Sequence, residues 1–287
     1  MRLGVHFVNY SPPAGEQIGS TLARAAVLAD EAGVGMFTLA DHFLGVGDAH
    51  HPFLECYTSL GFLAGQTNSI ALSALVTGVT YRRAGELAKT VSTLDVLSQG
   101  RAMLGIGVAW YERGHTAMGL PFPPVPKRFE VLEETLQVCQ QMWSPNDGPY
   151  EGKHCQLGET ICEPRLPRPT PILIAGGGEK NTLRLVARYA DVWSAAVQSV
   201  DELKHKKEVL KRHCDNAGRD PDDIEVTKGF FFQDPFEDFD GFLKDVETYA
   251  AQGVSLIHVG VMPGNPDPIG FIGRTCDELL PKLAAIG

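Results

Sequence analysis

Three consecutive glycines, Gly176–Gly178, lie between a short apolar segment and a stretch with helical periodicity. Glycine has no Cβ, so such a run lets backbone N–H groups approach an anion, and the positive end of a helix dipole follows directly. Lys180 and Arg184 could add positive charge. A tight strand-to-helix turn is the alternative, but a single glycine with positive φ would be enough for it. The run therefore favours a phosphate site.

Asp41 and His42 form a second candidate, because they follow directly after the apolar segment 35–40. Histidine titrates near neutral pH, so a histidine beside a carboxylate at a strand end could exchange a proton with a substrate. The alternative is a histidine that only ties its loop to a nearby carbonyl group. The residues alone leave both interpretations open.

No metal centre is expected. The six cysteines form no C-x-x-C pair, and no pair of histidines completes a zinc-ligand spacing. The nearest cluster, His154, Cys155 and Cys162, fits ordinary thiols in a reducing compartment better than a structural zinc site. A metal-dependent hydrolase barrel would need several ligands at its strand ends, and the first apolar segment offers only His6.

These candidates are positioned by a chain that alternates between short apolar segments and helix-period segments. Strands are expected at 2–8, 35–40, 70–76, 102–107, 172–175, 191–195, 224–231 and 256–261, each followed by a helix. Eight β–α units in 287 residues favour the α/β class and a closed (β/α)8 TIM barrel with parallel strands. A doubly wound dinucleotide-binding sheet would carry G-x-G-x-x-G after its first strand, and residues 9–15 do not.

We expect a single domain over residues 1–287. The amphipathic helix 128–142 is followed by a segment rich in Gly and Pro that is too long for a simple barrel connection. We interpret residues 144–170 as an insertion after the fourth helix, lying over the barrel. The active site of such a barrel lies at the C-terminal ends of its strands, where His42 and the glycine run are expected.

Charge and hydropathy limit the classes of function. Lys and Arg number 25 against 35 Asp and Glu, and the net charge of −10 argues against a general nucleic-acid binder and against adhesion to anionic membranes. The first residues lack the features of a signal peptide, and no apolar stretch reaches the ~18–20 residues that span a bilayer. We expect a cytoplasmic protein that acts on a small molecule, with no nucleic-acid or membrane partner.

The order of several segments resembles the bacterial luciferase-like family of flavin and deazaflavin oxidoreductases. The matching segments are DHF at 41–43, PFLE at 52–55, LVTGVTYRRAGELAKTVSTLDVLSQGRAMLGIGVAW at 75–110, PFPPVPKRFEVLEETLQV at 121–138 and PILIAGGGEKNTLRLVARYADVW at 171–193. The likeness covers roughly residues 1–195 in clear motifs. Within the family, the string GGGEKNTLRLVARYADVW is most similar to the actinobacterial branch that uses the 5-deazaflavin coenzyme F420.

The resemblance implies a luciferase-like barrel with the cofactor ring in its mouth and the cofactor phosphate near the glycine run. His42 would be the catalytic residue, as a proton donor or as a stabiliser of negative charge on the ring, held by Asp41 or by backbone. Family members carry a non-prolyl cis peptide at the end of the third strand, which by motif position is Leu75–Val76. The implied cofactor-binding residues are Asp41, Leu75, Val76, Thr77, Val108, Ala109, Gly176, Gly177, Gly178 and Glu179.

The sequence departs from the family pattern after the fourth strand. Relatives often have Gly-Trp-Asn where this chain has Ala109-Trp110-Tyr111, and the sugar-phosphate dehydrogenases have a glutamate acid near the position of Trp110. This difference argues against sugar-phosphate oxidation. We expect a more apolar substrate pocket that includes His6, Phe43, Trp110 and Tyr111. The least patterned loops, 43–51, 109–121 and 146–164, would form its walls.

The resemblance predicts an oxidoreductase that transfers a hydride between F420 and a small organic substrate. The alternative is an FMN-dependent luciferase-like monooxygenase that uses reduced flavin and O2. Both cofactors carry a ribityl phosphate, so the glycine run does not separate them. A barrel that binds a cofactor without catalysis is a third possibility. Family members are commonly homodimers, so a homodimer is expected here.

Overall fold

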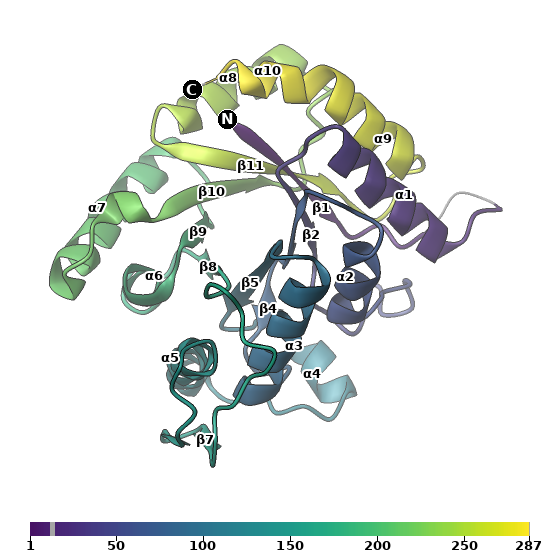
Figure 1. Cartoon of the computed structure of the whole chain (residues 1–287). Coiled ribbons are helices and arrows are strands. Elements are labelled where there is room, and N and C mark those ends of the chain that lie inside the picture. The colour runs from purple at the N-terminus through teal and green to yellow at the C-terminus, as the bar shows by residue number, and fades with distance from the viewer. Residues whose placement is uncertain (12–14, 287) are drawn as a thin grey trace.

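A computed structural model describes residues 1–11 and 15–286, and its centre is a closed barrel of parallel strands (Figure 1). The barrel strands are β1 (Arg2–Phe7), β2 (Met36–Leu39), β3 (Ala71–Ala74) with its continuation β4 (Thr77–Gly78), β5 (Ala102–Gly107), β8 (Ile172–Gly176), β9 (Val192–Ala195), β10 (Glu225–Phe230) and β11 (Val254–Val261). Each strand pairs in parallel with the next, and the pairing of β11 with β1 closes the ring. The expected (β/α)8 barrel is confirmed.

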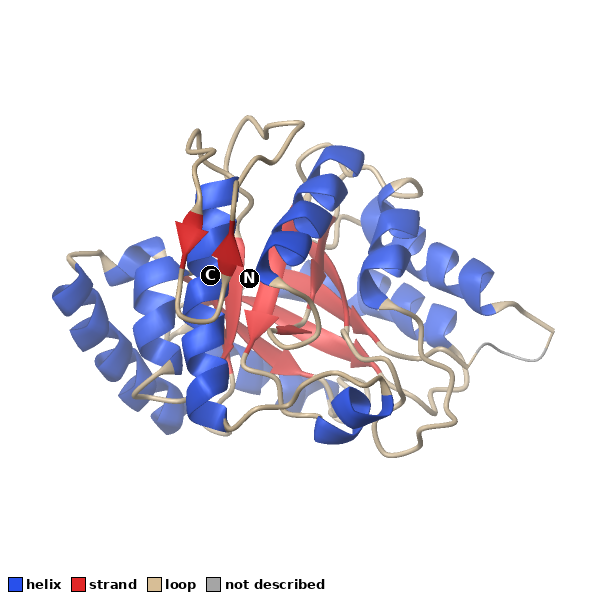
Figure 2. Ribbon diagram, turned by 90° about the horizontal axis from the view of Figure 1, so that it is seen from below, coloured by secondary structure: helices blue, strands red, loops and turns tan. Residues whose placement is uncertain are grey.

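Helices surround the strands, as Figures 1 and 2 show. They are α1 (Ile18–Glu31), α2 (Cys56–Ala64), α3 (Ala84–Leu97), α4 (Glu112–Ala117), α5 (Val125–Met142), α6 (Thr182–Tyr189), α7 (Val200–Ala217), α8 (Phe239–Ala250), α9 (Pro268–Arg274) and α10 (Leu280–Ala284), with a 3-10 turn η1 (Pro221–Asp223) and a π-helical turn η2 (Thr275–Leu279). The short α4 was not expected from the sequence, because six residues are too few to show a helical period. None of the described helices is long and apolar enough to cross a membrane.

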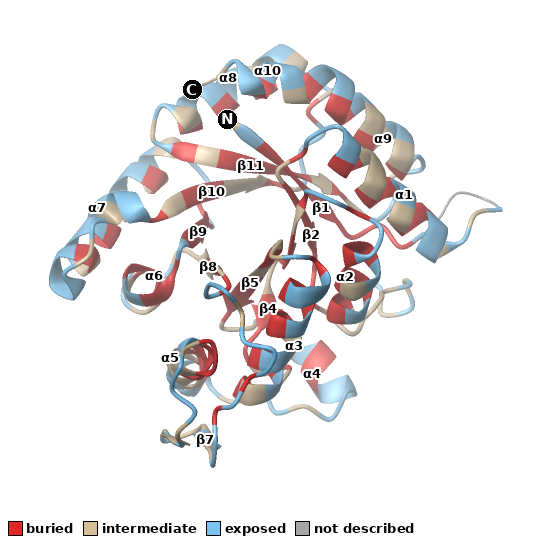
Figure 3. Cartoon of the chain, viewed as in Figure 1, coloured by how far each residue is buried: buried red, intermediate tan, exposed pale blue. Residues whose placement is uncertain are grey.

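Successive side chains along each barrel strand point alternately toward the surrounding helices and toward the inside of the barrel. In β1, Leu3 and Phe7 are buried in the apolar core, which Figure 3 shows between the strands and the helices. Gly4 and His6 occupy the alternate positions. Gly4 is paired with His258 of the adjacent strand β11, and a Cβ on Gly4 would lie 2.5 Å from the His258 imidazole, so this ring fills the inward space beside the glycine. The interior of the barrel is therefore partly polar.

The third barrel strand is interrupted between β3 and β4. The Leu75–Val76 peptide bond at this point is cis, which confirms the position expected from the family resemblance. The interruption packs closely against β5, because a Cβ on Gly107 would lie 3.0 Å from Val76 Cγ2. The strand end is thus held as a bulge at the mouth of the barrel.

The insertion over residues 144–170 packs on the outside of the helical layer, and the expectation that it lies over the barrel is wrong. It carries the antiparallel pair β6 (Tyr150–Glu151) and β7 (Gln156–Leu157), which lies beyond α5 at the edge of the molecule in Figure 1. The Glu134 carboxylate of α5 accepts hydrogen bonds from the backbone N–H groups of Lys153, His154 and Cys155. This side-chain contact, which composition does not reveal, fixes the insertion on the helix surface.

Candidate active site

The C-terminal ends of the barrel strands surround a cavity of about 490 Å³. This is the place where barrels of this type bind ligands. Seven of the residues predicted from the sequence line it: His42, Leu75, Val76, Val108, Ala109, Trp110 and Gly176. The structure therefore brings the bulge of the third strand, the end of β5 and the first glycine of the run into one site.

His42 lies in the cavity wall with its ring among aromatic side chains. Its Nδ1 is 3.1 Å from the Tyr81 hydroxyl, and the ring centroids of Phe53, Trp110 and Tyr111 lie between 5.4 and 6.0 Å from its own. Burial lowers the pKa of His42 to about 4, and the nearby His115 adds to the shift. The imidazole is therefore neutral at pH 7. This corrects the expectation that His42 titrates near neutral pH.

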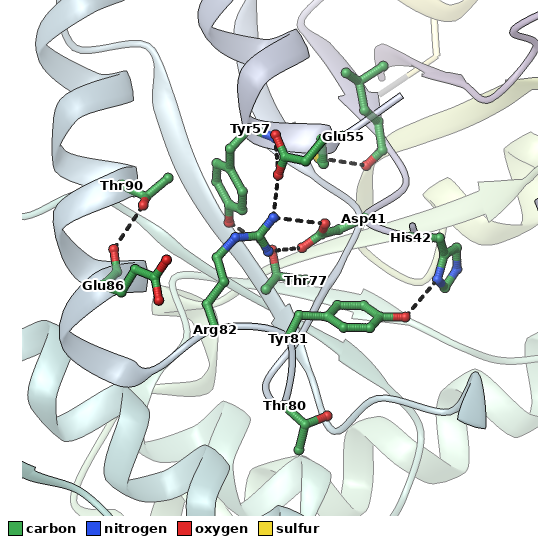
Figure 4. A network of polar contacts seen from close by, with 12 residues as sticks. Asp41, His42, Glu55, Tyr57, Thr77, Thr80, Tyr81, Arg82, Glu86 and Thr90 are labelled. Atoms are coloured by element: carbon green, nitrogen blue, oxygen red, sulfur yellow. Dashed lines mark hydrogen bonds and ion pairs between the residues drawn. The ribbon is translucent and has the colours of Figure 1, made fainter. Parts of the chain in front are cut away.

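The Tyr81 side chain contacts His42 and is itself positioned by His115. Its ring stacks on His115, with centroids 4.3 Å apart and an interplanar angle of 17°. His115 Nδ1 donates to the Tyr111 carbonyl at 2.9 Å, so in the neutral ring Nε2 accepts from the Thr80 hydroxyl at 2.6 Å. Figure 4 shows the Tyr81 hydroxyl directed at His42. Tyr81 was not among the site residues predicted from the sequence.

Asp41 does not hold His42, and this expectation is corrected. Its carboxylate pairs with Arg82 through two hydrogen bonds of 2.6 and 3.3 Å, and Arg82 also contacts Glu55 (Figure 4). Burial raises the pKa of the Asp41 carboxyl, and the Arg82 guanidinium opposes this shift. The neighbouring Thr77 is buried and shares a hydrogen bond of 2.7 Å with the Tyr57 hydroxyl. Both Asp41 and Thr77 lie behind the cavity wall.

Phe43 and Tyr111 also lie next to the cavity rather than in its lining. The Phe43 ring packs edge-on against Tyr81, with centroids 5.2 Å apart. The Tyr111 hydroxyl donates to the Gly45 carbonyl at 3.1 Å. Both residues were expected in the substrate pocket. The structure instead places them beside His42, outside the cavity lining, so they would affect a substrate only through their neighbours.

The end of β5 has an unusual backbone. Ala109 has φ 65°, a conformation that residues with a Cβ rarely adopt. Arg128 of α5 donates from Nη1 to the Ala109 carbonyl at 2.8 Å and fixes it in place. A Cβ on Gly78 would lie 2.9 Å from the Ala109 Cβ, so the ends of β4 and β5 touch at this point.

The glycine run forms a cradle between β8 and α6. Gly176 has φ 129°, and its carbonyl accepts a hydrogen bond of 2.7 Å from Trp193 Nε1. A Cβ on Gly177 would fall 2.7 Å from the Ala196 carbonyl oxygen, so a larger residue does not fit there. Helix α6 begins at Thr182 without a side-chain cap, and its Leu183 N–H donates to the Gly178 carbonyl at 3.0 Å. The geometry fits an anion next to the cavity.

The charges around the glycine run differ from those expected. Arg184 forms a bidentate ion pair with Glu133 of α5, at 2.7 and 2.8 Å, and is therefore taken up by this contact. Lys206 of α7 instead places its ammonium 2.6 Å from the carbonyl of the middle glycine. Gly178 and Glu179 are exposed and lie outside the cavity lining. Lys206 was missed because it lies in a helix that shows only a charged surface pattern.

The family model of luciferase-like monooxygenases matches residues 1–233 of the chain. The chain belongs to this family. Two of its luciferase-like relatives are F420-dependent glucose-6-phosphate dehydrogenases. The enzyme of Kineococcus radiotolerans is 32% identical over 174 residues, which are 60% of this chain and 51% of that enzyme. The enzyme of Microbacterium testaceum is 29% identical over 216 residues, 74% and 63% of the respective chains. The match thus spans about half of the first enzyme and less than two thirds of the second.

Two solved structures of similar shape cover nearly the whole luciferase-like barrel. An F420-dependent secondary alcohol dehydrogenase in complex with an F420–acetone adduct has a TM-score of 0.84 at 16% identity, over 98% of each chain. The F420-dependent tetrahydromethanopterin reductase of Methanopyrus kandleri has a TM-score of 0.79 at 18% identity, over 98% of this chain and 99% of that chain. At this level of identity these structures establish the fold.

Two strand ends of the luciferase-like barrel complete the cavity and were not assigned from the sequence. Residues 194–198 form the end of β9 and the turn after it, and Lys228, Gly229, Phe231 and Phe232 lie at the end of β10. The barrel rule alone could have identified them, because the C-terminal ends of all eight strands point to the same mouth. The loop 146–164 lines no part of this cavity, which corrects the expectation that it forms a wall.

His6 lies beneath the cavity of the luciferase-like barrel, and its expected place in the substrate pocket is corrected. Its Nδ1 is 2.9 Å from the Thr38 hydroxyl, and its ring lies under Phe231, with centroids 4.9 Å apart. Burial lowers the pKa of His6 to about 4 and that of the inward-facing His258 to about 3. Both rings are therefore neutral in the folded chain.

The buried histidines predict that acid destabilises the fold. The unfolded chain takes up these protons near pH 6.5, whereas His6 and His42 in the folded chain take them up near pH 4 and His258 near pH 3. The contribution of these three histidines to the free energy of unfolding should be complete above pH 7 and fall between pH 6.5 and 4, by about 1.4 kcal/mol per pH unit for each proton. Urea unfolding at pH 7.5, 6 and 5 measures this slope.

The His258→Gln variant tests how much one of these histidines contributes to the pH dependence of the free energy of unfolding. Its slope between pH 6 and 5 should be smaller than that of the unmodified chain by about 1.4 kcal/mol per pH unit. His50→Gln, in an exposed loop, serves as the matched control and should leave the slope unchanged. An unaltered slope in His258→Gln would contradict the assignment of a buried neutral imidazole at this position.

Proposed function

We propose that this chain is an oxidoreductase that transfers a hydride between coenzyme F420 and a small organic substrate. The observation that carries the proposal is the meeting, in one cavity, of the Leu75–Val76 bulge, the Gly176 cradle and a neutral His42. The F420-dependent relatives support the same cofactor. Bound F420 would supply a ring carbon that accepts or returns a hydride.

The residues of the cavity fit a planar ring with a phosphate-bearing chain. Val76, Val108 and Ala109 form apolar walls on which such a ring can lie. Gly176 leaves the backbone open to an anion, and the ammonium of Lys206 lies directly behind the run. The fit therefore rests on the shape of the walls and on the open backbone of the glycine run, because Lys206 is also paired with Glu202 at 3.3 Å.

His42 would move the proton that accompanies the hydride. With Nδ1–H donating to the Tyr81 hydroxyl oxygen, the neutral ring keeps Nε2 free to accept a proton from a substrate hydroxyl in the direction of oxidation. In the direction of reduction the same nitrogen returns the proton to a carbonyl oxygen. The Trp110 and Tyr111 rings lie 5.6 and 5.4 Å from the His42 ring and form the aromatic surroundings in which this transfer would take place.

We further propose that the chain acts as a single-domain, cytoplasmic homodimer whose partner is a small molecule rather than a nucleic acid or a membrane. The net charge of −10 supports the exclusion of polyanionic partners. The cavity volume of about 490 Å³ falls in the range of small-molecule sites, ~300–1,000 Å³, and supports the class of partner.

Turnover tests the proposed reaction. Oxidised F420 mixed with the protein and a panel of small alcohols under anaerobic conditions should lose its absorbance as it is reduced. Reduced F420 with the matching ketones should regain it. Turnover that requires reduced FMN and O2, and is absent with F420, would contradict the proposal and favour the monooxygenase alternative.

Gly177→Val should weaken F420 binding by at least about tenfold, or 1.4 kcal/mol. The added side chain meets the Ala196 carbonyl, so the loop must move from the position in which its backbone can approach a phosphate. A fluorescence titration with F420 measures the dissociation constant. Gly218→Ala at the end of α7, where φ is 67°, strains a glycine away from the cavity and is the control. Equal F420 affinity in folded Gly177→Val and Gly218→Ala would refute the phosphate cradle.

A further inference from the structure

The wall of the cavity carries little charge. Among the described residues that line it there is no aspartate, glutamate or arginine, and Lys228 is the single lysine. The remaining polar side chains, among them Ser194 and Gln198, are neutral hydrogen-bonding groups. A phosphorylated substrate is normally held by more than one cationic side chain with charge-assisted hydrogen bonds. This wall offers poor recognition of such a substrate.

The lysine at the wall is turned toward the helices. The Lys228 ammonium donates to the Gly229 carbonyl at 2.6 Å and lies 4.9 and 5.7 Å from the ring centroids of Phe230 and Tyr249. Tyr249 belongs to α8, whose Phe242 and Tyr249 rings pack edge-on against Phe230 of β10. Burial lowers the pKa of Lys228, in keeping with its place between a strand and a helix. The charge is therefore already engaged by the Gly229 carbonyl and by two aromatic rings.

Two large aromatic side chains border the same cavity and remain exposed. Trp110, after β5, is 66% exposed, and Phe232, after β10, is 89% exposed. A single exposed aromatic residue is ordinary, but two on the rim of one cavity form an apolar surface that a ligand can cover. The Trp110 ring also lies 5.6 Å from that of His42. An apolar group packed on Trp110 would thus bring its attached oxygen close to the proton acceptor.

We infer that the cavity selects uncharged, apolar alcohols and ketones, and that Trp110 and Phe232 determine this selectivity. The inference rests on the proposed F420 function. In the oxidation of a secondary alcohol, the C–H bond at the carbinol carbon breaks and its hydride reduces F420. The O–H bond breaks as well, its proton passes to His42, and the carbon–oxygen double bond of the ketone forms.

Binding to the protein separates this selectivity from turnover. The probes are cyclohexanone, acetophenone and glucose 6-phosphate, each titrated by calorimetry with and without saturating F420. Trp143 and Trp193 are buried, so a change in tryptophan emission of the apo protein on adding cyclohexanone reports Trp110. Cyclohexanone should bind at least about tenfold more tightly than glucose 6-phosphate. Equal or tighter binding of glucose 6-phosphate would overturn the inference.

Two variants identify the selecting side chains. Trp110→Ala and Phe232→Ala should each raise the dissociation constant of cyclohexanone by about tenfold, the range for loss of an aromatic contact. Phe232→Ala should raise KM for cyclohexanol with kcat little changed, because its contact is the same in the ground and transition states. Trp110→Ala should also lower kcat, since this ring abuts His42. Phe62→Ala, an exposed aromatic position on α2, is the matched control.

Further outcomes distinguish the proposed selection of apolar substrates from the proposed use of F420. Unchanged cyclohexanone affinity in both Trp110→Ala and Phe232→Ala would overturn the role of the aromatic rim, whatever the cofactor. Retained preference for cyclohexanone in a protein that binds no F420 would support the apolar cavity and contradict the proposed cofactor. F420 affinity within twofold of the unmodified value in Phe232→Ala would show that this side chain acts on substrate.

Discussion

His42→Ala should lower the rate of hydride transfer to F420 by about 10²–10⁴-fold, the usual contribution of a positioned acid–base group. The residue lines the cavity, its Nδ1 is held by Tyr81, and its ring is neutral at pH 7, so it can accept the proton of a substrate hydroxyl. Single-turnover absorbance measurements with F420 and cyclohexanol give this rate directly, free of product release.

The pH profile gives a second test of the same residue. Protonation of a ring whose pKa is about 4 would remove the proton acceptor, so oxidation should slow as the pH falls toward 4. That limb should be absent in His42→Ala. His51→Ala, in the adjacent loop and outside the cavity lining, is the matched control. An unchanged single-turnover rate per folded molecule in His42→Ala, with the limb retained, would reduce His42 to a loop-pinning residue.

Arg82→Met should lower the free energy of unfolding by about 3–5 kcal/mol, the cost of leaving one member of a buried ion pair without its partner. The side chains of Arg82 and Asp41 are only 9% and 1% exposed, and Asp41 keeps a carboxylate in the protein interior once the guanidinium is removed. Urea denaturation at pH 7.5 measures the loss. The same variant should disturb His42, because Tyr81 is next to Arg82 in the chain.

The double variant Asp41→Asn/Arg82→Met tests the cause of this loss. Removing both charges should recover a large part of the stability, since no unpaired buried charge remains. Arg274→Met breaks an exposed pair with Glu278 and should cost at most about 1 kcal/mol. A loss of the same small size in Arg82→Met would contradict a buried, energetically coupled ion pair at Asp41.

The barrel was predictable from the sequence because its signal is repeated. Each of eight apolar segments precedes a helical segment, and errors of a few residues at their ends, such as the start of β11 at Val254 instead of 256, leave the topology unchanged. The cis bond at Leu75–Val76 was predictable only through the family motif, since nothing in the residue types Leu and Val favours it.

The partner of His42 was not predictable from adjacency. Successive side chains of an extended segment point to opposite sides, so Asp41 and His42 face different surroundings although they are neighbours in the chain. Asp41 meets Arg82 and His42 meets Tyr81, 39 residues away. The lowered pKa of His42 depends on burial by residues brought from several strand ends. Neither the Tyr81 contact nor the lowered pKa of His42 can therefore be predicted without the positions of these residues in the fold.

A side-by-side titration of the apo protein with F420 and FMN tests the central claim most directly. Both ligands carry a phosphate that the glycine run can hold, so a difference in affinity reports the fit of the ring against the walls around Val76 and Val108. We expect one F420 bound per chain, at least about tenfold more tightly than FMN. Tight binding of FMN with weak or no binding of F420 would contradict the proposed deazaflavin chemistry.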